Sequence, residues 1–281
     1  MKVGTSPRVA ALTLFAMLAF AGNSLLCRIA LRDTAIDAAS FTSIRLASGA
    51  LVLVAIMLAR KSHPLTAGSW PMAAMLFAYA ALFSFAYRQL TAATGALLLF
   101  GAVQTSMLGY ALAKGERLRP LQVGGLLVAV GGLIYMLLPG LAAPPIVSAA
   151  CMLLAGASWA VYSVLGRGVK DPVGATAGNF LRSLPFTLVL SLATAGDARI
   201  DAAGVGYAVL SGAITSGLGY VLWYAALPAL TATSAATVQL SVPALAALGG
   251  VVLLSETMSP RLLVASVTIL GGIALTISRR K

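Results

Sequence analysis

Two arginines lie deep inside apolar stretches of this sequence, where a charged side chain is costly. Arg45 and Arg182 each stand well inside their runs, and an arginine at such a depth in a membrane needs water or an acceptor. Each can hold the carboxylate of a substrate or bond to helix-end carbonyls. Because the two recur at matching places in an internal repeat, we favour the second, structural role.

Aromatic and amide side chains inside other apolar runs form a candidate pocket. Tyr79 and Phe83 are four residues apart and share one face of a helix. Flat aromatic walls with a few polar groups suit an amphipathic solute, and amides suit a zwitterion. The candidate substrate contacts are Trp159 and Gln239 first, then Asn23, Tyr79, Phe83, Tyr220 and Asn179. Tyr87 and Tyr224 lie nearer the ends of their runs, which favours an interfacial belt.

Two prolines inside apolar runs modify the backbone beside these residues. Pro243 removes the hydrogen bond to the carbonyl of Gln239, and Pro185 does the same for Leu181, next to Arg182. A carbonyl freed at membrane depth must face protein or a water-filled cavity. We therefore expect structural or gating roles for Pro243 and Pro185.

The acidic residues are informative by their placement. All seven lie in loops or at the ends of apolar runs, so no carboxylate is expected at a membrane midplane, where ion coupling commonly uses one. We therefore expect transport without proton coupling. Glu116 and Glu256 each stand four residues before a proline that opens the next helix, where a carboxylate can meet the positive end of that helix. We assign both to the structure of their loops, with gating as the weaker alternative.

Residue patterns for catalysis, metals and cofactors are missing. There is no phosphate-binding loop and no H-E-x-x-H, and Cys27 and Cys151 both fall within apolar runs. We expect no catalytic residues, no metal and no cofactor. A membrane-embedded enzyme acting on lipid would need a nucleophile with a base or metal, and the scattered Ser and Thr have no such partner. A scaffold or channel is a further alternative.

The elements that position these residues follow from composition. Sixty per cent of the residues are hydrophobic and 9% are charged, which is typical of a membrane protein. The net charge of +12 lies in short gaps between apolar runs and sets topology, so no nucleic-acid partner is expected. Ten runs are long enough to span a bilayer: 9–31, 38–59, 70–87, 91–113, 120–138, 146–166, 173–194, 203–225, 231–253 and 260–278.

An internal repeat organises these runs. Glu116, Pro120 and Gly131-Gly132 recur as Glu256, Pro260 and Gly271-Gly272. We therefore expect an all-α membrane protein with ten transmembrane helices, as two inverted five-helix repeats over residues 1–140 and 141–281. Lys and Arg gather mainly on the side that holds both termini, which predicts cytoplasmic termini in a bacterial-type inner membrane. We expect the consecutive glycines to allow close packing of the fifth and tenth runs.

A family resemblance adds to this. The arginine in the second helix of each repeat, Ala157-Ser158-Trp159-Ala160, the run ending in Leu254-Ser255-Glu256 and the closing Gly-Gly resemble the EamA-type drug/metabolite transporter superfamily. Within it the chain looks like a bacterial aromatic amino-acid exporter. The resemblance implies a monomeric or dimeric carrier in the lipid bilayer, with a small-molecule substrate in a central cavity and alternating access. Multidrug or metabolite efflux or uptake is the alternative within the superfamily.

Overall fold

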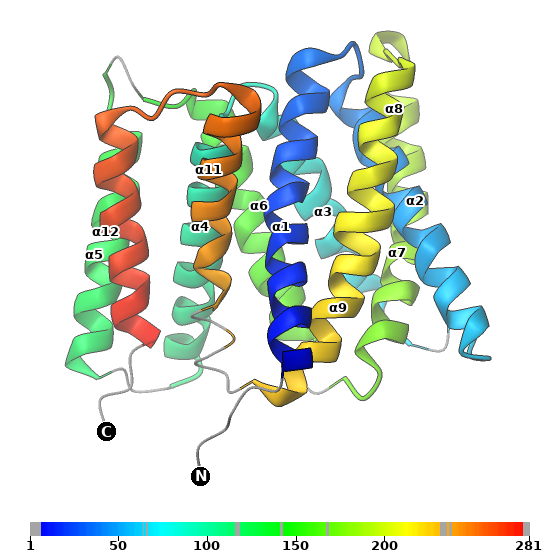
Figure 1. Cartoon of the computed structure of the whole chain (residues 1–281), viewed down its shortest axis with the longest axis horizontal. Helices are drawn as coiled ribbons and strands as arrows, with labels where there is room; N and C mark the ends of the chain where they lie inside the picture. Colours follow the sequence, from blue (N-terminus) through cyan, green and yellow to red (C-terminus); the bar gives the residue numbers. More distant parts are fainter. Residues whose placement is uncertain are drawn as a thin grey trace.

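The computed structural model describes residues 7–63, 65, 67–115, 119–140, 143–166, 169–230, 235 and 238–277, and the described part is built from helices. The helices stand side by side in a bundle (Figure 1). In the first half they are α1 (Pro7–Asp33), α2 (Ala38–Ala59), α3 (Trp70–Tyr87), α4 (Ala92–Ala113) and α5 (Pro120–Leu137).

The second half holds α6 (Ile146–Leu165), α7 (Pro172–Ala193), α8 (Ala202–Val209), the π-helical segment η2 (Leu210–Leu218), α9 (Gly219–Ala226), α11 (Ser241–Leu254) and α12 (Pro260–Ile277). α8, η2 and α9 follow one another without a break, and two short 3₁₀ turns lie at Ala195–Asp197 and Leu227–Ala229. In Figure 1, α1 begins and α12 ends at the same end of the bundle.

Local capping signals explain where many helices begin. The Asp37 side chain accepts hydrogen bonds from the first turn of α2, and Thr91 does the same for α4. Asp171 and Asp201 cap α7 and α8. A proline occupies the first turn of α3, α5, α7 and α12, where its missing N–H costs no helical hydrogen bond.

The ninth apolar run differs most from expectation. We expected one helix over 231–253 with Pro243 in its interior; residues 231–234 and 236–237 lie outside the described residues, 235, 238 and 239 are helical, and after a turn at Leu240 the helix α11 begins at Ser241 with Pro243 buried in its first turn. The physical reason is that proline lacks an N–H and fits a helix start better than a helix interior.

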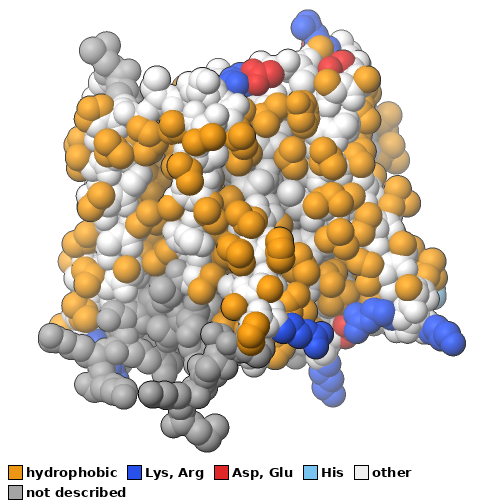
Figure 2. Space-filling model, in the orientation of Figure 1, with side chains coloured by type: hydrophobic (Ala, Val, Ile, Leu, Met, Phe, Trp, Pro, Cys, Tyr) orange, Lys and Arg blue, Asp and Glu red, His pale blue; other side chains and the backbone are white. Residues whose placement is uncertain are grey.

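Among the described residues, seven helices are long and apolar enough to cross a membrane. They are α1 to α6 and the continuous helix Ala202–Ala229, while α11 and α12 are shorter apolar helices. α7 is as long as α2 and each carries one arginine, but α7 also carries Asn179, Pro172 and Pro185, which lower its hydropathy. In Figure 2, hydrophobic side chains cover the visible flank of the bundle, and charged side chains gather at its two ends.

The consecutive glycines behave differently from one another. A Cβ on Gly272 would lie 2.6 Å from the carbonyl oxygen of Gly125, and one on Gly132 would lie 2.8 Å from Ile269, so α5 and α12 pack closely there. A Cβ on Gly131 or Gly271 would meet no atom of another element within 4 Å. Adjacent residues point about 100° apart on a helix, so only one glycine of each pair meets the partner helix.

Candidate substrate cavity

A cavity of about 620 Å³ lies between the helices of the bundle. Residues of α1, α3, α4, α6, α7, η2 and α9 line it, together with residues 235 and 239 and a few residues between helices. Six of the seven side chains that we predicted as substrate contacts line this one cavity: Asn23, Tyr79, Phe83, Trp159, Tyr220 and Gln239.

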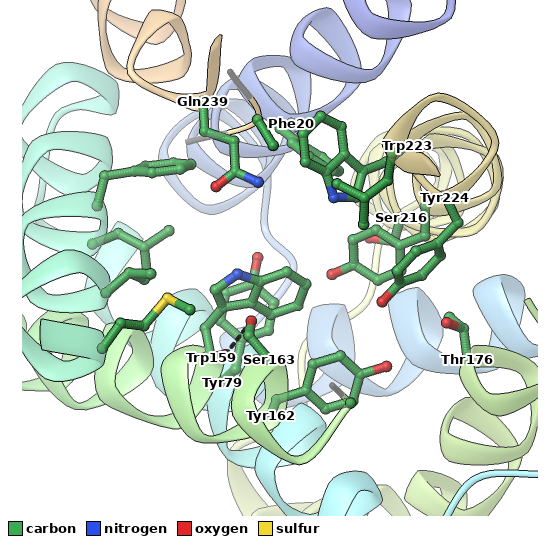
Figure 3. A pocket seen from close by; sticks show the side chains of 18 of the residues that line it. Phe20, Tyr79, Trp159, Tyr162, Ser163, Thr176, Ser216, Trp223, Tyr224 and Gln239 are labelled. Atoms are coloured by element: carbon green, nitrogen blue, oxygen red, sulfur yellow. Dashed lines mark hydrogen bonds between the residues drawn. The ribbon is translucent and has the colours of Figure 1, made fainter. Parts of the chain in front are cut away.

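Aromatic rings form much of the cavity wall. The ring of Trp159 is centred 4.9 Å from that of Tyr79 and 5.4 Å from that of Tyr220, and it stacks on Tyr162 at 5.3 Å. Figure 3 shows Gln239 pointing toward the Trp159 indole from the opposite wall. A flat apolar group can therefore lie against Trp159 while the Gln239 amide offers both a donor and an acceptor.

One corner of the cavity is polar. The Asn23 Nδ2 amide donates to the Tyr79 hydroxyl at 3.3 Å, and the Asn23 carbonyl oxygen accepts from Ser211 at 2.8 Å and from Thr215 at 3.4 Å. Ser216 lines the same cavity. The corner therefore joins α1, α3 and η2 through hydrogen bonds between neutral groups.

Arg45 lies directly behind this corner. Its Nη2 donates to the Tyr79 hydroxyl and its Nε to the Ser216 hydroxyl, both at 3.3 Å. The guanidinium carbon also lies 5.4 Å from the ring centre of Tyr79 and 5.1 Å from that of Phe83. The residue is 2% exposed, and Nη1 is buried without a hydrogen-bond partner in the described part of the chain.

A close backbone contact brings η2 to Arg45. Gly212 leaves no room for a Cβ, which would collide with the Arg45 carbonyl and with Ser48. This contact places Ser216, one turn further along η2, beside the guanidinium. Gly212 therefore has a packing role in this segment.

Arg182, the repeat partner of Arg45, has different surroundings. Its Nη1 donates to the Ala67 carbonyl at 2.8 Å and its Nη2 to the Leu65 carbonyl at 3.1 Å. Both carbonyls belong to the segment that precedes α3. We expected helix-end carbonyls for both arginines; Arg182 bonds instead to loop carbonyls just before α3, and Arg45 bonds to hydroxyls.

Asn179 lies outside the cavity wall. Its Oδ1 accepts from the backbone N–H of Ser69 at 2.9 Å, and its Nδ2 donates to the Tyr162 hydroxyl at 3.3 Å. Ser69 is the N-cap of α3, so Asn179 joins the start of that helix to α7. Pro185 lies inside α7 and does not line the cavity.

Glu256 joins several elements at one end of the bundle. Its Oε1 pairs with Arg28 Nε at 3.0 Å, and its Oε2 accepts from the backbone N–H of Ala92 at 2.8 Å. Arg28 also donates to the carbonyl of Tyr87 at 3.1 Å. We call the contacts of Arg28, Glu256, Ala92 and Tyr87 the Arg28–Glu256 clamp.

The clamp corrects one expectation. We expected Glu256 to meet the start of the helix that Pro260 opens, but it caps α4, and the Ser259 hydroxyl accepts from the first turn of α12. Ser255 has a left-handed backbone with φ 52°, and this turn directs the chain back toward α4. Glu116, the repeat partner of Glu256, lies outside the described residues.

The cavity reaches the opposite end of the bundle from the clamp. Ala111 near the end of α4, Gly166 after α6 and Leu227 after α9 line it there, at the end where α1 begins. Val169 and Pro172, which precede or begin α7, line it as well. The cavity is therefore continuous from the polar corner to that end.

Several cavity residues were missed by sequence reasoning. Tyr224, which we assigned to an interfacial belt, lines the cavity, and Tyr87 is fully buried rather than interfacial. Phe20, Tyr162 and Trp223 also line it (Figure 3). Tyr162 and Trp223 stand three positions from Trp159 and Tyr220, so helical spacing was the signal that could have found them. In the described residues, no group of three His, Cys, Asp or Glu side chains could hold a metal ion.

Comparison with known proteins gives a consistent picture. Residues 147–278 match the model of the EamA-like transporter family. An uncharacterized protein of Pseudomonas aeruginosa is 58% identical over 97% of this chain and 96% of its own length. The threonine/homoserine exporter RhtA of Escherichia coli is 28% identical over 88% of this chain and 84% of its own length.

A solved protein crystal structure has the same fold, with a TM-score of 0.65 and 21% identity over 95% of this chain and 96% of the other. The family match, the relationship to an exporter and the apolar helices long enough to cross a membrane agree with one another. This chain is therefore a multi-pass membrane transporter that belongs to the EamA-like transporter family.

Proposed function

We propose that this transporter exports small neutral amino acids, with threonine-like and aromatic ones among its substrates. The observation that carries the proposal is the single cavity that joins an aromatic wall around Trp159 to a polar corner at Asn23 and Tyr79. A zwitterion with a small or flat side chain matches that combination. The relationship to a threonine/homoserine exporter supports the same class of substrate.

The proposed mechanism is alternating access between two inverted repeats, residues 1–140 and 141–281, with ten membrane crossings in all. Pairings between helices support it, because they recur when each helix is exchanged for its repeat partner. α4 packs against α6 as α11 packs against α1, and α3 packs against α7 as η2 packs against α2. Rocking one repeat against the other would open the cavity at alternate ends.

We also propose that the cavity opens to the cytoplasm in this structure, in a bacterial-type inner membrane. The end reached by the cavity is the one where α1 begins, and most Lys and Arg of the sequence belong to that side. The Arg28–Glu256 clamp closes the other end.

Counterflow in liposomes tests the proposed function. Purified protein should exchange labelled threonine, phenylalanine and tryptophan saturably, and Trp159→Ala should lower exchange of the aromatic substrates about tenfold through loss of ring contacts. Trp70→Ala is the matched control, because Trp70 is 55% exposed and does not line the cavity. Exchange that does not saturate would instead indicate a channel. Exchange only of amphipathic compounds that are not amino acids would favour the efflux alternative.

A further inference from the structure

Arg45 is a buried cation without a carboxylate partner. The ion pairs of the described residues are Arg28–Glu256, Arg32–Asp33 and Arg60–Asp171, and none of them includes Arg45. Its partners are two neutral hydroxyls and two aromatic rings, and Nη1 is left unpaired. A buried charge of this kind is stabilised strongly by an anion brought close to it.

Arg182 shows that this arrangement is not required by the repeat. The same residue in the second repeat has its guanidinium bonded to two carbonyls and is only partly buried. A purely structural role for Arg45 predicts similar carbonyl partners. Instead the guanidinium is directed at Tyr79 and Ser216, which both line the cavity.

The bonds from Arg45 fix how the two hydroxyls can act. An arginine only donates hydrogen bonds, so the oxygens of Tyr79 and Ser216 are acceptors toward it. The Tyr79 oxygen also accepts from Asn23. Neither hydroxyl proton has an acceptor among the described residues, so each remains available to donate to an atom in the cavity.

We infer that Tyr79 and Ser216, supported by Arg45 behind them, form the receptor for the carboxylate of the substrate. This inference rests on the proposed amino-acid function and specifies which residues bind the carboxylate of the amino acid. Two hydroxyl donors backed by a cation match the two oxygens of a carboxylate, while the substrate side chain faces the aromatic wall at Trp159. Arg45 acts as a positioning residue, because its own nitrogens are not exposed to the cavity.

Competition between an acid and its amide tests the receptor. Threonine and threonine amide have nearly the same shape, but only threonine carries a carboxylate. In the unaltered transporter, threonine should compete with labelled threonine about tenfold or more better than the amide does. Ser216→Ala and Tyr79→Phe should weaken competition by threonine and leave competition by the amide nearly unchanged. The ratio of the two competition strengths, threonine over amide, should therefore fall toward one.

Arg45→Gln should reduce the same ratio, and Arg45→Lys, which keeps the charge, should restore part of it. Ser163→Ala removes a hydroxyl elsewhere in the cavity wall, one that is bonded to the Trp159 carbonyl, and should leave the ratio as it was. If Arg45→Gln cannot be purified as folded protein, Ser216→Ala and Tyr79→Phe decide the question.

Two outcomes would overturn the inference in different ways. The carboxylate receptor would be overturned if Ser216→Ala and Tyr79→Phe weakened competition by threonine and by threonine amide equally. It would also be overturned if both compounds competed equally well in the unaltered transporter. In either case the proposed amino-acid exchange would still stand. No exchange of any amino acid by the unaltered transporter would overturn the proposed function and the receptor together.

Discussion

Asp37 ties three segments together at the clamp end of the bundle. Its Oδ1 accepts from the backbone N–H groups of Ala39 and Ser40, which caps α2, and its Oδ2 accepts from that of Arg199. Burial by itself raises the pKa of this carboxyl. Hydrogen bonds from Ser40, from the Arg199 backbone and from Ala39 outweigh burial and hold the pKa below its ordinary value of 3.8.

A lowered pKa in the folded state means that Asp37 stabilises the fold above pH 3.8, and that this contribution is lost as pH falls through the folded value. We expect Asp37→Ala to lower the free energy of unfolding by about 1 kcal/mol at neutral pH. Thermal unfolding in detergent at neutral pH and near pH 3 checks this. The difference in stability between the unaltered protein and Asp37→Ala should be smaller in acid.

Asp37→Asn is the control, because it keeps an acceptor for the first turn of α2 but has no charge. It should lose less stability than Asp37→Ala, and the difference between the two variants should not depend on pH, because neither variant has a group that titrates at this position. If Asp37→Ala lost as much stability in acid as at neutral pH, that result would contradict this role of the carboxylate.

At the scale of the element, the Arg28–Glu256 clamp connects the ends of α3 and α11 with the start of α4 and with α1. Both charged side chains are largely buried, at 12% and 7% exposure, and removing one partner of such a pair leaves the other poorly compensated. Glu256→Gln should therefore shift the protein toward opening at the clamp end.

A cysteine in the cavity measures this shift. With Cys151 replaced by serine, Ser24→Cys should react about tenfold faster with a membrane-impermeant maleimide from the clamp side when Glu256→Gln is added, which corresponds to about 1.4 kcal/mol. Arg60→Gln is the control, because the Arg60–Asp171 pair is 3.8 Å long and about half exposed. Labelling from the clamp side that does not change with Glu256→Gln would rule out a gating role for this pair.

At the scale of the whole molecule, the described acidic groups lie at the ends of the bundle. In the described part of the chain, the carboxylates are Asp33, Asp37, Asp171, Asp197, Asp201 and Glu256, and each stands at a helix end or between helices. None of these lies at the middle of the bundle, where a proton-coupled carrier commonly places one.

We therefore expect exchange that depends on the substrate gradient alone. Counterflow of threonine should proceed at the same rate with and without an imposed pH gradient, at a fixed substrate gradient. A control with an ionophore that abolishes the pH gradient separates coupling from leak. Collapse of uptake when only the pH gradient is removed would show that a proton is carried.

Much of the architecture is local and could be read from the sequence. Apolar runs and the breaks between them predicted most helix bounds to within two residues, and local caps such as Thr91 and Asp171 and the proline starts explain these bounds, because such signals act within one turn. Six side chains of the cavity were also found from the sequence, since an amide deep in an apolar helix turns inward to find polar partners and aromatic rings suit the wall of a pocket.

The surroundings of those side chains depend on how the helices are rotated and packed, and only the tertiary structure decided them. Arg45 and Arg182 are equivalent in the sequence, yet one meets cavity hydroxyls and the other loop carbonyls. Glu256 caps α4 rather than its own neighbour α12. Sequence specifies which groups must leave lipid, but the partner of each group is set by contacts between residues far apart in the chain.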